Sequence, residues 1–298
     1  MDHPLDSGPV SESAVQPVVQ TRLGRHAALL AITALTTTVA GAYWEGVDPF
    51  ADPRLLVRGV PFAATLITIL LVHEAGHYVM CLRHGVAASL PYFLPAPPQI
   101  FWLGTFGAFI RIRSRFPDRR ALFDIGAAGP WAGFVVALVA TVVGLAHSTV
   151  LPVRPEAHVF EFGDSLLTAF LARHVLHASP DTVLLHPVAL AGWFGLFVTS
   201  INLIPVGQLD GGHVLYALSA RRLRAVASLL IASLIWLGVH GWPGWIVWAM
   251  IIAVLVSIGH PPTADDARGL GLVRRLAGVA TFVIFVLTFV AEPFKIIP

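Results

Sequence analysis

The sequence predicts an all-α polytopic membrane protein with about seven transmembrane helices and one irregular or β-like loop embedded in the membrane. Of its 298 residues, 56% are hydrophobic and only 12% are charged, whereas a soluble domain carries about 25% charged residues. The mean hydropathy is +0.76. Most apolar residues gather in runs of roughly the 20 residues that a helix needs to cross a bilayer.

The N-terminal residues 1–25 are largely polar and contain proline, so we expect a disordered cytoplasmic tail. Residues 26–298 should then form one membrane domain. Its apolar runs predict spans at residues 26–43, 56–82, 121–146 and 187–204, a fifth ending near 239, a sixth ending near 258 and a seventh at 273–290. The polar stretch before the fourth span has room for a short amphipathic helix near residues 166–176.

The segment after the second span, residues 86–118, does not have the pattern of a helix. It is apolar but contains Pro91, Pro95, Pro97 and Pro98, and proline at this density excludes a continuous helix. The sequence LGTFGAFIRIR follows, which is rich in β-branched and aromatic residues. Non-helical backbone is tolerated at membrane depth where it is buried in protein or lines a wet cavity. We therefore expect a membrane-embedded loop or short hairpin here.

The basic residues predict the orientation, because cytoplasmic loops of membrane proteins carry an excess of Arg and Lys. With seven spans and the N-terminus in the cytoplasm, five of the 19 basic residues lie outside: Arg54, Arg58, Arg154, Arg173 and Lys295. The other fourteen lie on the cytoplasmic side. The net charge is only +2, so these arginines indicate topology and not a surface for nucleic acid.

The second predicted span ends in LVHEAGHYVM, which places His73 and His77 four positions apart. Positions i and i+4 share one face of a helix, so the two imidazoles can bind one Zn²⁺. Glu74, beside the first histidine, can take a proton from a metal-bound water. A chance occurrence of the HExxH motif is less favoured inside a span. Placing an unpaired carboxylate such as Glu74 within the bilayer costs about 2.5 kcal/mol or more of free energy.

A catalytic zinc usually has three protein ligands, and Asp210 is the main candidate for the third. It is one of very few ionisable residues within the predicted spans, and metal binding would offset the cost of burying its charge. Pro205 breaks the incoming helix, and Gly211 and Gly212 let the backbone approach a neighbour. A helix-capping role for Asp210 is the alternative.

These motifs resemble the site-2 protease family of intramembrane zinc metalloproteases. The family pairs HExxH in a span with a later N-x-x-P-x-x-x-L-D-G-G, here His73 to His77 and Asn202 to Gly212. Three further segments resemble its bacterial and plastid branch, the ethylene-dependent gravitropism-deficient, yellow-green type: PYFLPAPP, FDIGAAGPWAGF and GHPPTAD. The resemblance covers most of the chain, and we expect neither the PDZ nor the CBS domains that other members carry.

The resemblance implies that His73, His77 and Asp210 bind one Zn²⁺ per chain and that Glu74 is the general base. Asn202 would place the substrate strand or stabilise the oxyanion, and Gly129 with Pro130 matches the family's glycine–proline step. The expected activity is cleavage of transmembrane segments in regulated intramembrane proteolysis. The partners would be the lipid bilayer and single-span membrane proteins, including membrane-bound transcriptional regulators, with no nucleic acid. The expected location is the bacterial inner membrane.

Two other classes remain open from the residues alone. A metal-ion transporter could use the same His and Asp side chains as a transit site, but it would not need Glu74 as a base. An inactive relative could only bind transmembrane helices, although the intact ligand set argues against it. Near the motifs, we expect an interfacial or supporting role for His213, while His260 is either structural or close to the site.

Overall fold

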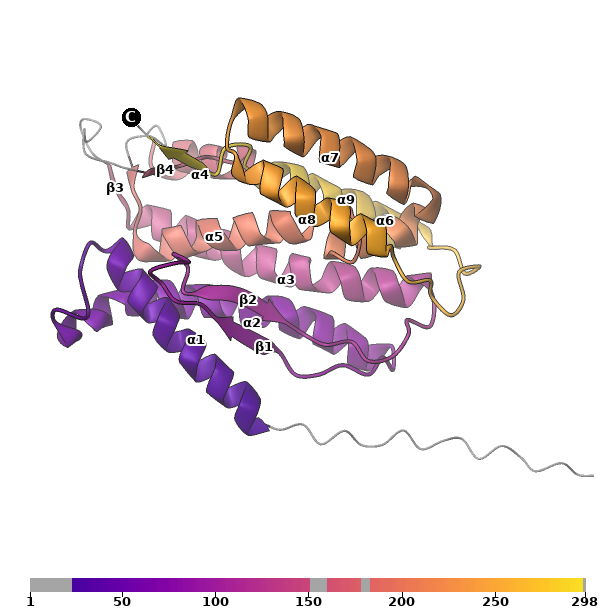
Figure 1. Ribbon diagram of the computed structural model, residues 1–298, viewed down its shortest axis with the longest axis horizontal. Helices are drawn as coiled ribbons and strands as arrows, with labels where there is room; N and C mark the ends of the chain where they lie inside the picture. Colours follow the sequence, from indigo (N-terminus) through magenta and orange to yellow (C-terminus); the bar gives the residue numbers. More distant parts are fainter. Residues whose placement is uncertain (1–22, 151–159, 178–182, 297–298) are drawn as a thin grey trace, which may run out of the picture.

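The computed structural model describes residues 23–150, 160–177 and 183–296, and these residues are mainly helical (Figure 1). The helices of the first half are α1 (Leu23–Trp44), α2 (Val60–Arg83), α3 (Arg119–Ala146) and α4 (Leu166–Val175). Those of the second half are α5 (Pro187–Asn202), α6 (Asp210–Ser219), α7 (Leu223–His240), α8 (Gly244–Ile258) and α9 (Leu272–Thr288). Two 3₁₀ turns, η1 (Pro53–Gly59) and η3 (Ala220–Arg222), precede α2 and α7. The described residues are therefore mainly helical, as the sequence predicted.

Four helical runs among the described residues are long and apolar enough to cross a membrane: Leu23–Trp44, Pro53–Arg83, Arg119–Ala146 and Asp210–His240. Three further helices lie where spans were predicted, but α5, α8 and α9 have only 16, 15 and 17 residues. At 1.5 Å per residue, each is shorter than the roughly 30 Å hydrocarbon core. The count of seven spans therefore stays a prediction.

The boundaries agree with the predicted elements to within a few residues, with one correction at the N-terminus. Helix α1 begins at Leu23, so the expected tail of residues 1–25 is too long by three residues. The rest of the tail, residues 1–22, lies outside the described residues. The amphipathic helix predicted near residues 166–176 is present as α4, and Ser165 caps it in a capping box.

Three small antiparallel sheets accompany the helices: β1 (Tyr92–Pro95) with β2 (Thr105–Phe109), β3 (Thr149–Val150) with β5 (Val183–Leu184), and β4 (Phe160–Phe162) with β6 (Phe294–Ile296). The first is a hairpin within the proline-rich segment, with Tyr92 opposite Phe109 and a register shift at Pro95. Proline excluded a helix here, while the aromatic and β-branched residues support strands. The hairpin lies beside α1 and α2.

Helix α3 is the element around which the others pack, since it contacts α2, α5, α6 and α9. Its first turn is capped by Asp118, whose carboxylate accepts a hydrogen bond from the Ala121 N–H at 2.8 Å. Helix α2 runs antiparallel to α3, because His84 near its end contacts Asp124 near the start of α3 at 3.0 Å. Asp124 also accepts two hydrogen bonds from Arg274 of α9, at 2.8 and 2.7 Å. This carboxylate therefore joins α2, α3 and α9.

Helices α5 and α6 run in the same direction along α3. Gly192 of α5 packs against Thr141 of α3, whereas His213 of α6 packs against Gly126, about four turns nearer the start of α3. Between the two helices, residues 203–209 are not helical. Pro205 cannot donate a helical hydrogen bond, which accounts for the break. The break lies beside the HExxH part of α2, so it brings the second motif to the first.

Candidate metal centre

The two histidines of the HExxH motif lie on one face of α2, as their spacing predicts. Their Nε2 atoms are 3.2 Å apart, and both side chains are buried. The Nδ1 atom of His77 lies 2.7 Å from the carbonyl oxygen of Ile125 in α3. A carbonyl oxygen only accepts, so His77 carries its proton on Nδ1 and presents a lone pair on Nε2. This is the tautomer that a metal ligand needs, held by a supporting hydrogen bond.

Asp210, the first residue of α6, completes the group. One of its carboxylate oxygens lies 3.3 Å from Nε2 of His73 and 3.3 Å from Nε2 of His77. The ligand atoms of these three residues all lie within 4.8 Å of one another. Three electron-rich atoms from α2 and α6 thus converge on one point, although 133 residues separate His77 from Asp210.

Gly211 and Gly212, which follow Asp210, lie against the backbone of the segment that precedes Asp210. A Cβ atom at Gly211 would overlap the carbonyl oxygen of Leu203, and one at Gly212 would lie 2.5 Å from the carbonyl oxygens of Val206 and Gly207. The non-helical segment therefore folds back against the first turn of α6. Only residues without a side chain fit there, and this contact places Asp210 at the level of the histidines.

Glu74 and Asn202 lie next to this group without belonging to it. Glu74 is buried, and its carboxyl group is close to the backbone N–H of Ile110, just after strand β2. The Nδ2 atom of Asn202, the last residue of α5, lies 3.5 Å from Nε2 of His73. All five residues that the sequence singled out therefore meet in one place. The alternative role for Asp210, helix capping, is not observed, since the residue before α6 is Leu209 and no side chain caps the helix.

The donor set matches the preferences of Zn²⁺ for imidazole nitrogen and carboxylate oxygen with tetrahedral geometry. Three protein donors leave one position of a tetrahedron open, which is the arrangement of catalytic zinc sites. Burial adds a second argument, because the Asp210 carboxylate is mostly enclosed and needs positive charge beside it. In the described part of the chain, the groups that contact it are the two imidazoles.

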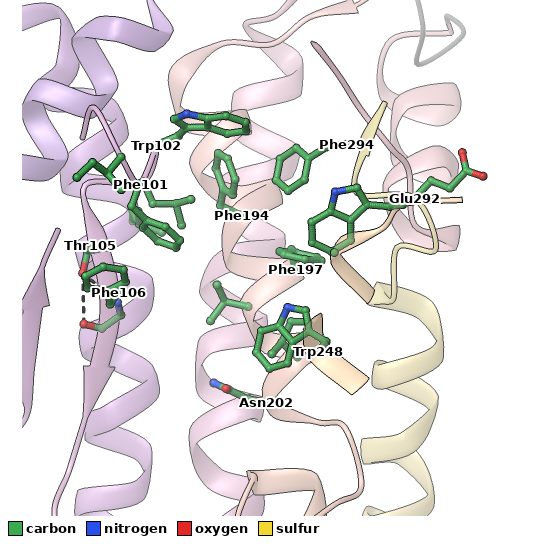
Figure 2. Close-up of a pocket in the computed structure, with 18 of the residues that line it drawn as sticks. Phe101, Trp102, Thr105, Phe106, Phe194, Phe197, Asn202, Trp248, Glu292 and Phe294 are labelled. Carbon is green, nitrogen blue, oxygen red and sulfur yellow. Dashed lines mark hydrogen bonds between the residues drawn. The ribbon is translucent and has the colours of Figure 1, made fainter. Parts of the chain in front are cut away.

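A large cavity extends from Asn202 towards the end of the molecule where α8 begins (Figure 2). Its volume is about 1080 Å³. Eight aromatic side chains line it, from the β1–β2 hairpin, α5, the α7–α8 turn, α8 and β6: Phe101, Trp102, Phe106, Phe194, Phe197, Trp242, Trp248 and Phe294. Figure 2 shows Asn202 at one end, below these rings. The sequence indicated neither this cavity nor the Ile125 carbonyl, because both arise from contacts between distant segments.

A buried His–His–Asp group with an adjacent glutamate, on helices that are apolar enough to cross a membrane, defines a membrane protein with a candidate metallopeptidase centre. The model of Peptidase family M50 matches residues 61–237. This match covers more than half of the chain and includes all five site residues. The chain belongs to this peptidase family.

Among curated proteins, the chain is similar to "Probable zinc metalloprotease EGY1, chloroplastic" of Oryza sativa subsp. japonica, with 33% identity over 83% of this chain and 44% of the relative. The protein of the same name from Arabidopsis thaliana is 33% identical over 80% of this chain and 43% of its own length. "Probable zinc metalloprotease EGY2, chloroplastic" of Arabidopsis thaliana is 32% identical over 59% and 32%. The chain spans less than half the length of these relatives.

These comparisons agree with the resemblance predicted from the motifs, and they favour a peptidase over a metal-ion transporter. The location of the relatives differs from the one expected here, since their names place them in the chloroplast. A bacterial inner membrane is therefore still a prediction for this chain, as are the functions of the individual site residues.

Proposed function

We propose that this protein is a zinc-dependent intramembrane endopeptidase that cleaves a transmembrane segment of a membrane-protein substrate. The observation that carries the proposal is the convergence of His73, His77 and Asp210 within 4.8 Å on apolar helices. The family match supports the peptidase activity, and the names of the relatives support zinc. The position of the site within membrane-type helices supports cleavage inside the bilayer.

The side chains around the centre fit the steps of peptide hydrolysis. When bound, Zn²⁺ would acidify a water molecule and polarise the scissile carbonyl. Glu74, on the turn that carries His73, would accept the proton of the attacking water and pass it to the leaving amine. The amide of Asn202, beside His73, would donate a hydrogen bond to the oxygen on which negative charge develops, or to the substrate strand. Burial of the site keeps bulk water from competing for these groups.

The aromatic cavity and the hairpin would receive the substrate. A peptide must be extended to be attacked, so a substrate helix must unwind near the centre. Among the described residues, strand β2 pairs only with β1, which leaves its second edge for an added strand. Thr105, Phe106 and Gly107 of β2 line the cavity that ends at Asn202. A single-span membrane protein, such as a membrane-bound transcriptional regulator, would enter by this route.

The arrangement of helices supports seven crossings with the N-terminus in the cytoplasm. Helices α5 and α6 run in one direction along α3, so together they would form one crossing. Helices α1, α2, α3, α7, α8 and α9 would supply the other six. The arginine excess then lies on the side where α2 ends and α3 begins, as the positive-inside rule requires. For a bacterial protein, this side is the cytoplasmic face of the inner membrane.

The cleavage test uses the purified full-length protein in proteoliposomes with a single-span model substrate. Cleavage is expected with zinc, and a strong chelator should abolish it. Glu74→Gln should reduce the rate by about 10² to 10⁴, the usual contribution of a general base, while zinc content stays unchanged. The control is Val139→Gln, which changes an exposed residue of α3 and should leave the cleavage rate unchanged. Undiminished cleavage by Glu74→Gln would overturn the mechanism, and zinc transport that survives in this variant would favour the transporter.

The orientation has its own test. The single cysteine, Cys81, is buried and can be replaced by Ser, after which one cysteine is added at Glu45 or Arg115. In intact cells, a membrane-impermeant maleimide should label the cysteine at 45, outside, and not the one at 115. The reverse pattern would contradict the proposed topology while leaving the peptidase activity untouched.

A further inference from the structure

Asp210 begins a short helix that neighbouring segments hold in place. Helix α6 has only ten residues, and the seven residues before it are not helical. On one side, α6 packs closely on α3, where a Cβ atom at Gly126 would lie 2.8 Å from Cβ of His213. On the other side, it contacts the loop between α8 and α9, residues 259–271, which we call the α8–α9 loop. The position of the proposed third ligand therefore depends on this loop as well.

Two polar contacts join the α8–α9 loop to α6. The Nδ1 atom of His213, one turn after Asp210, lies 2.7 Å from Nε2 of His260. One turn further along, the hydroxyl of Tyr216 donates to Oδ2 of Asp266 at 2.7 Å. The ring of His260 also stacks on that of Tyr216, with centroids 4.2 Å apart and an interplanar angle of 18°. The α8–α9 loop therefore contacts α6 at His213 and again at Tyr216, on two successive turns after Asp210.

The direction of the histidine–histidine hydrogen bond follows from a third group. The Nδ1 atom of His260 lies 2.8 Å from the carbonyl oxygen of Pro261. That oxygen only accepts, so the proton of a neutral His260 is on Nδ1 and its Nε2 has a lone pair. His213 must then donate from Nδ1 to His260. Burial lowers the pKa of His260, which favours the neutral ring that can accept this bond.

The α8–α9 loop is in turn fixed to the start of α3. The backbone N–H groups of Ala264 and Asp265 donate to the carbonyl oxygens of Phe116 and Pro117, at 2.9 and 3.0 Å. The side chain of Arg120 donates to the carbonyl oxygen of Gly269 at 3.1 Å. Helix α3 also provides the Ile125 carbonyl that orients His77. The same helix thus orients His77 directly and supports α6 through the loop.

We propose that His260 is a positioning residue that acts through His213 to hold Asp210 at the metal centre. This inference rests on the proposed zinc site. In this proposal, His260 itself contacts neither metal nor substrate. Its Nε2 atom accepts the hydrogen bond from His213 and so keeps α6 at the correct distance from α2. Loss of this anchor should let Asp210 move away from the histidines and weaken zinc binding. Changes in groups that orient metal ligands typically lower metal affinity by about 10- to 100-fold.

The test measures the zinc affinity of the purified full-length protein in detergent by competition with a chromogenic chelator. His260→Phe keeps a ring to stack on Tyr216 but removes the acceptor, and its zinc affinity should fall at least about tenfold. His260→Gln places an acceptor oxygen near the position of Nε2 and should restore most of the affinity. His213→Asn, which keeps a donor near the position of Nδ1, should likewise bind more tightly than His213→Ala.

His240→Phe is the matched control, because this exposed histidine bonds only to the Trp236 carbonyl of its own helix among the described residues. Its zinc affinity should equal that of the wild type. The inference is wrong if His260→Phe binds zinc as tightly as the wild type, or if His260→Gln binds as weakly as His260→Phe. A wild-type protein that binds no zinc would instead overturn the proposed function, and this inference with it.

Discussion

Gly129 of α3 lies directly against the imidazole ring of His77, so that a Cβ atom at position 129 would overlap Nε2, the atom that faces Asp210. Four residues later, a Cβ atom at Gly133 would lie 3.0 Å from Nδ1 of His73. The two glycines thus form the surface on which both imidazoles rest. The glycine pattern of this span, which indicates close helix contact in a membrane, here also makes room for the metal ligands.

Replacement of Gly129 should therefore inactivate the protein. In Gly129→Ala, the added methyl group would overlap the imidazole ring of His77. The Ile125 carbonyl holds this ring in place, so the ring cannot turn aside as the end of a flexible side chain could, and His77 must leave its position. We expect zinc affinity and substrate cleavage to fall at least about tenfold, as for other losses of ligand orientation. Gly24→Ala in α1, where the added Cβ has no neighbour within 4 Å, should change neither. Normal zinc binding by Gly129→Ala would show that the ring has another usable position.

Zinc should stabilise the folded protein through Asp210. A ligand that binds only the native state at 100 times its Kd contributes about 2.7 kcal/mol. Zinc should therefore raise the Tm of the wild type in detergent, whereas Asp210→Asn, which loses the charged ligand, should show a much smaller shift. The control is Asp164→Asn, because Asp164 is a carboxylate far from the site in sequence and lies just before α4. An equal shift in Asp210→Asn would contradict the role of Asp210 as a ligand.

Asn202 should affect turnover more than metal binding. Its amide lies beside His73 but is not one of the three ligand groups. If it stabilises the developing oxyanion, Asn202→Ala should lower kcat by about 10²- to 10³-fold with unchanged zinc content. Ser200→Ala, whose hydroxyl bonds within its own helix to Phe197, is a nearby control. A rise in KM with unchanged kcat would instead assign Asn202 to substrate placement.

The aromatic cavity should be the route by which substrate reaches the centre. Val198 lines it on α5, one helical turn before Asn202. Val198→Trp should fill space near Asn202 and slow cleavage of a single-span substrate, while zinc affinity remains that of the wild type. The control is Val139→Trp, because Val139 lies exposed on α3. Equal cleavage rates for the two variants would mean that substrate arrives by another path.

Much of the candidate site could be predicted because its signals are local. Histidines four apart on an apolar helix share a face whatever surrounds them, and a carboxylate within an apolar run needs a charged or metal partner. Both inferences agree with the geometry of His73, His77 and Asp210. Proline density likewise predicted that the segment after α2 would not be helical, and hairpin β1–β2 lies there.

Other features depend on contacts between distant segments, which no local sequence pattern predicts. The sequence predicted a helix break at Pro205, close to the observed end of α5 at Asn202. It did not reveal that α6 continues in the same direction, since this depends on packing along α3. The start of α1 at Leu23 also differs from the expected boundary, because apolar and polar residues mix at that end.

The sequence by itself determined the helical membrane class, the residues of the zinc-type motif and the helix on which two of them lie, because apolar run length and helical periodicity are properties of short segments. Only the tertiary structure decided how Asp210 reaches the histidines, which carbonyl sets the tautomer of His77 and which loop supports α6. Those relationships join residues from 47 to 149 positions apart. Their geometry follows from how whole helices pack, and close packing is a property of the assembled bundle.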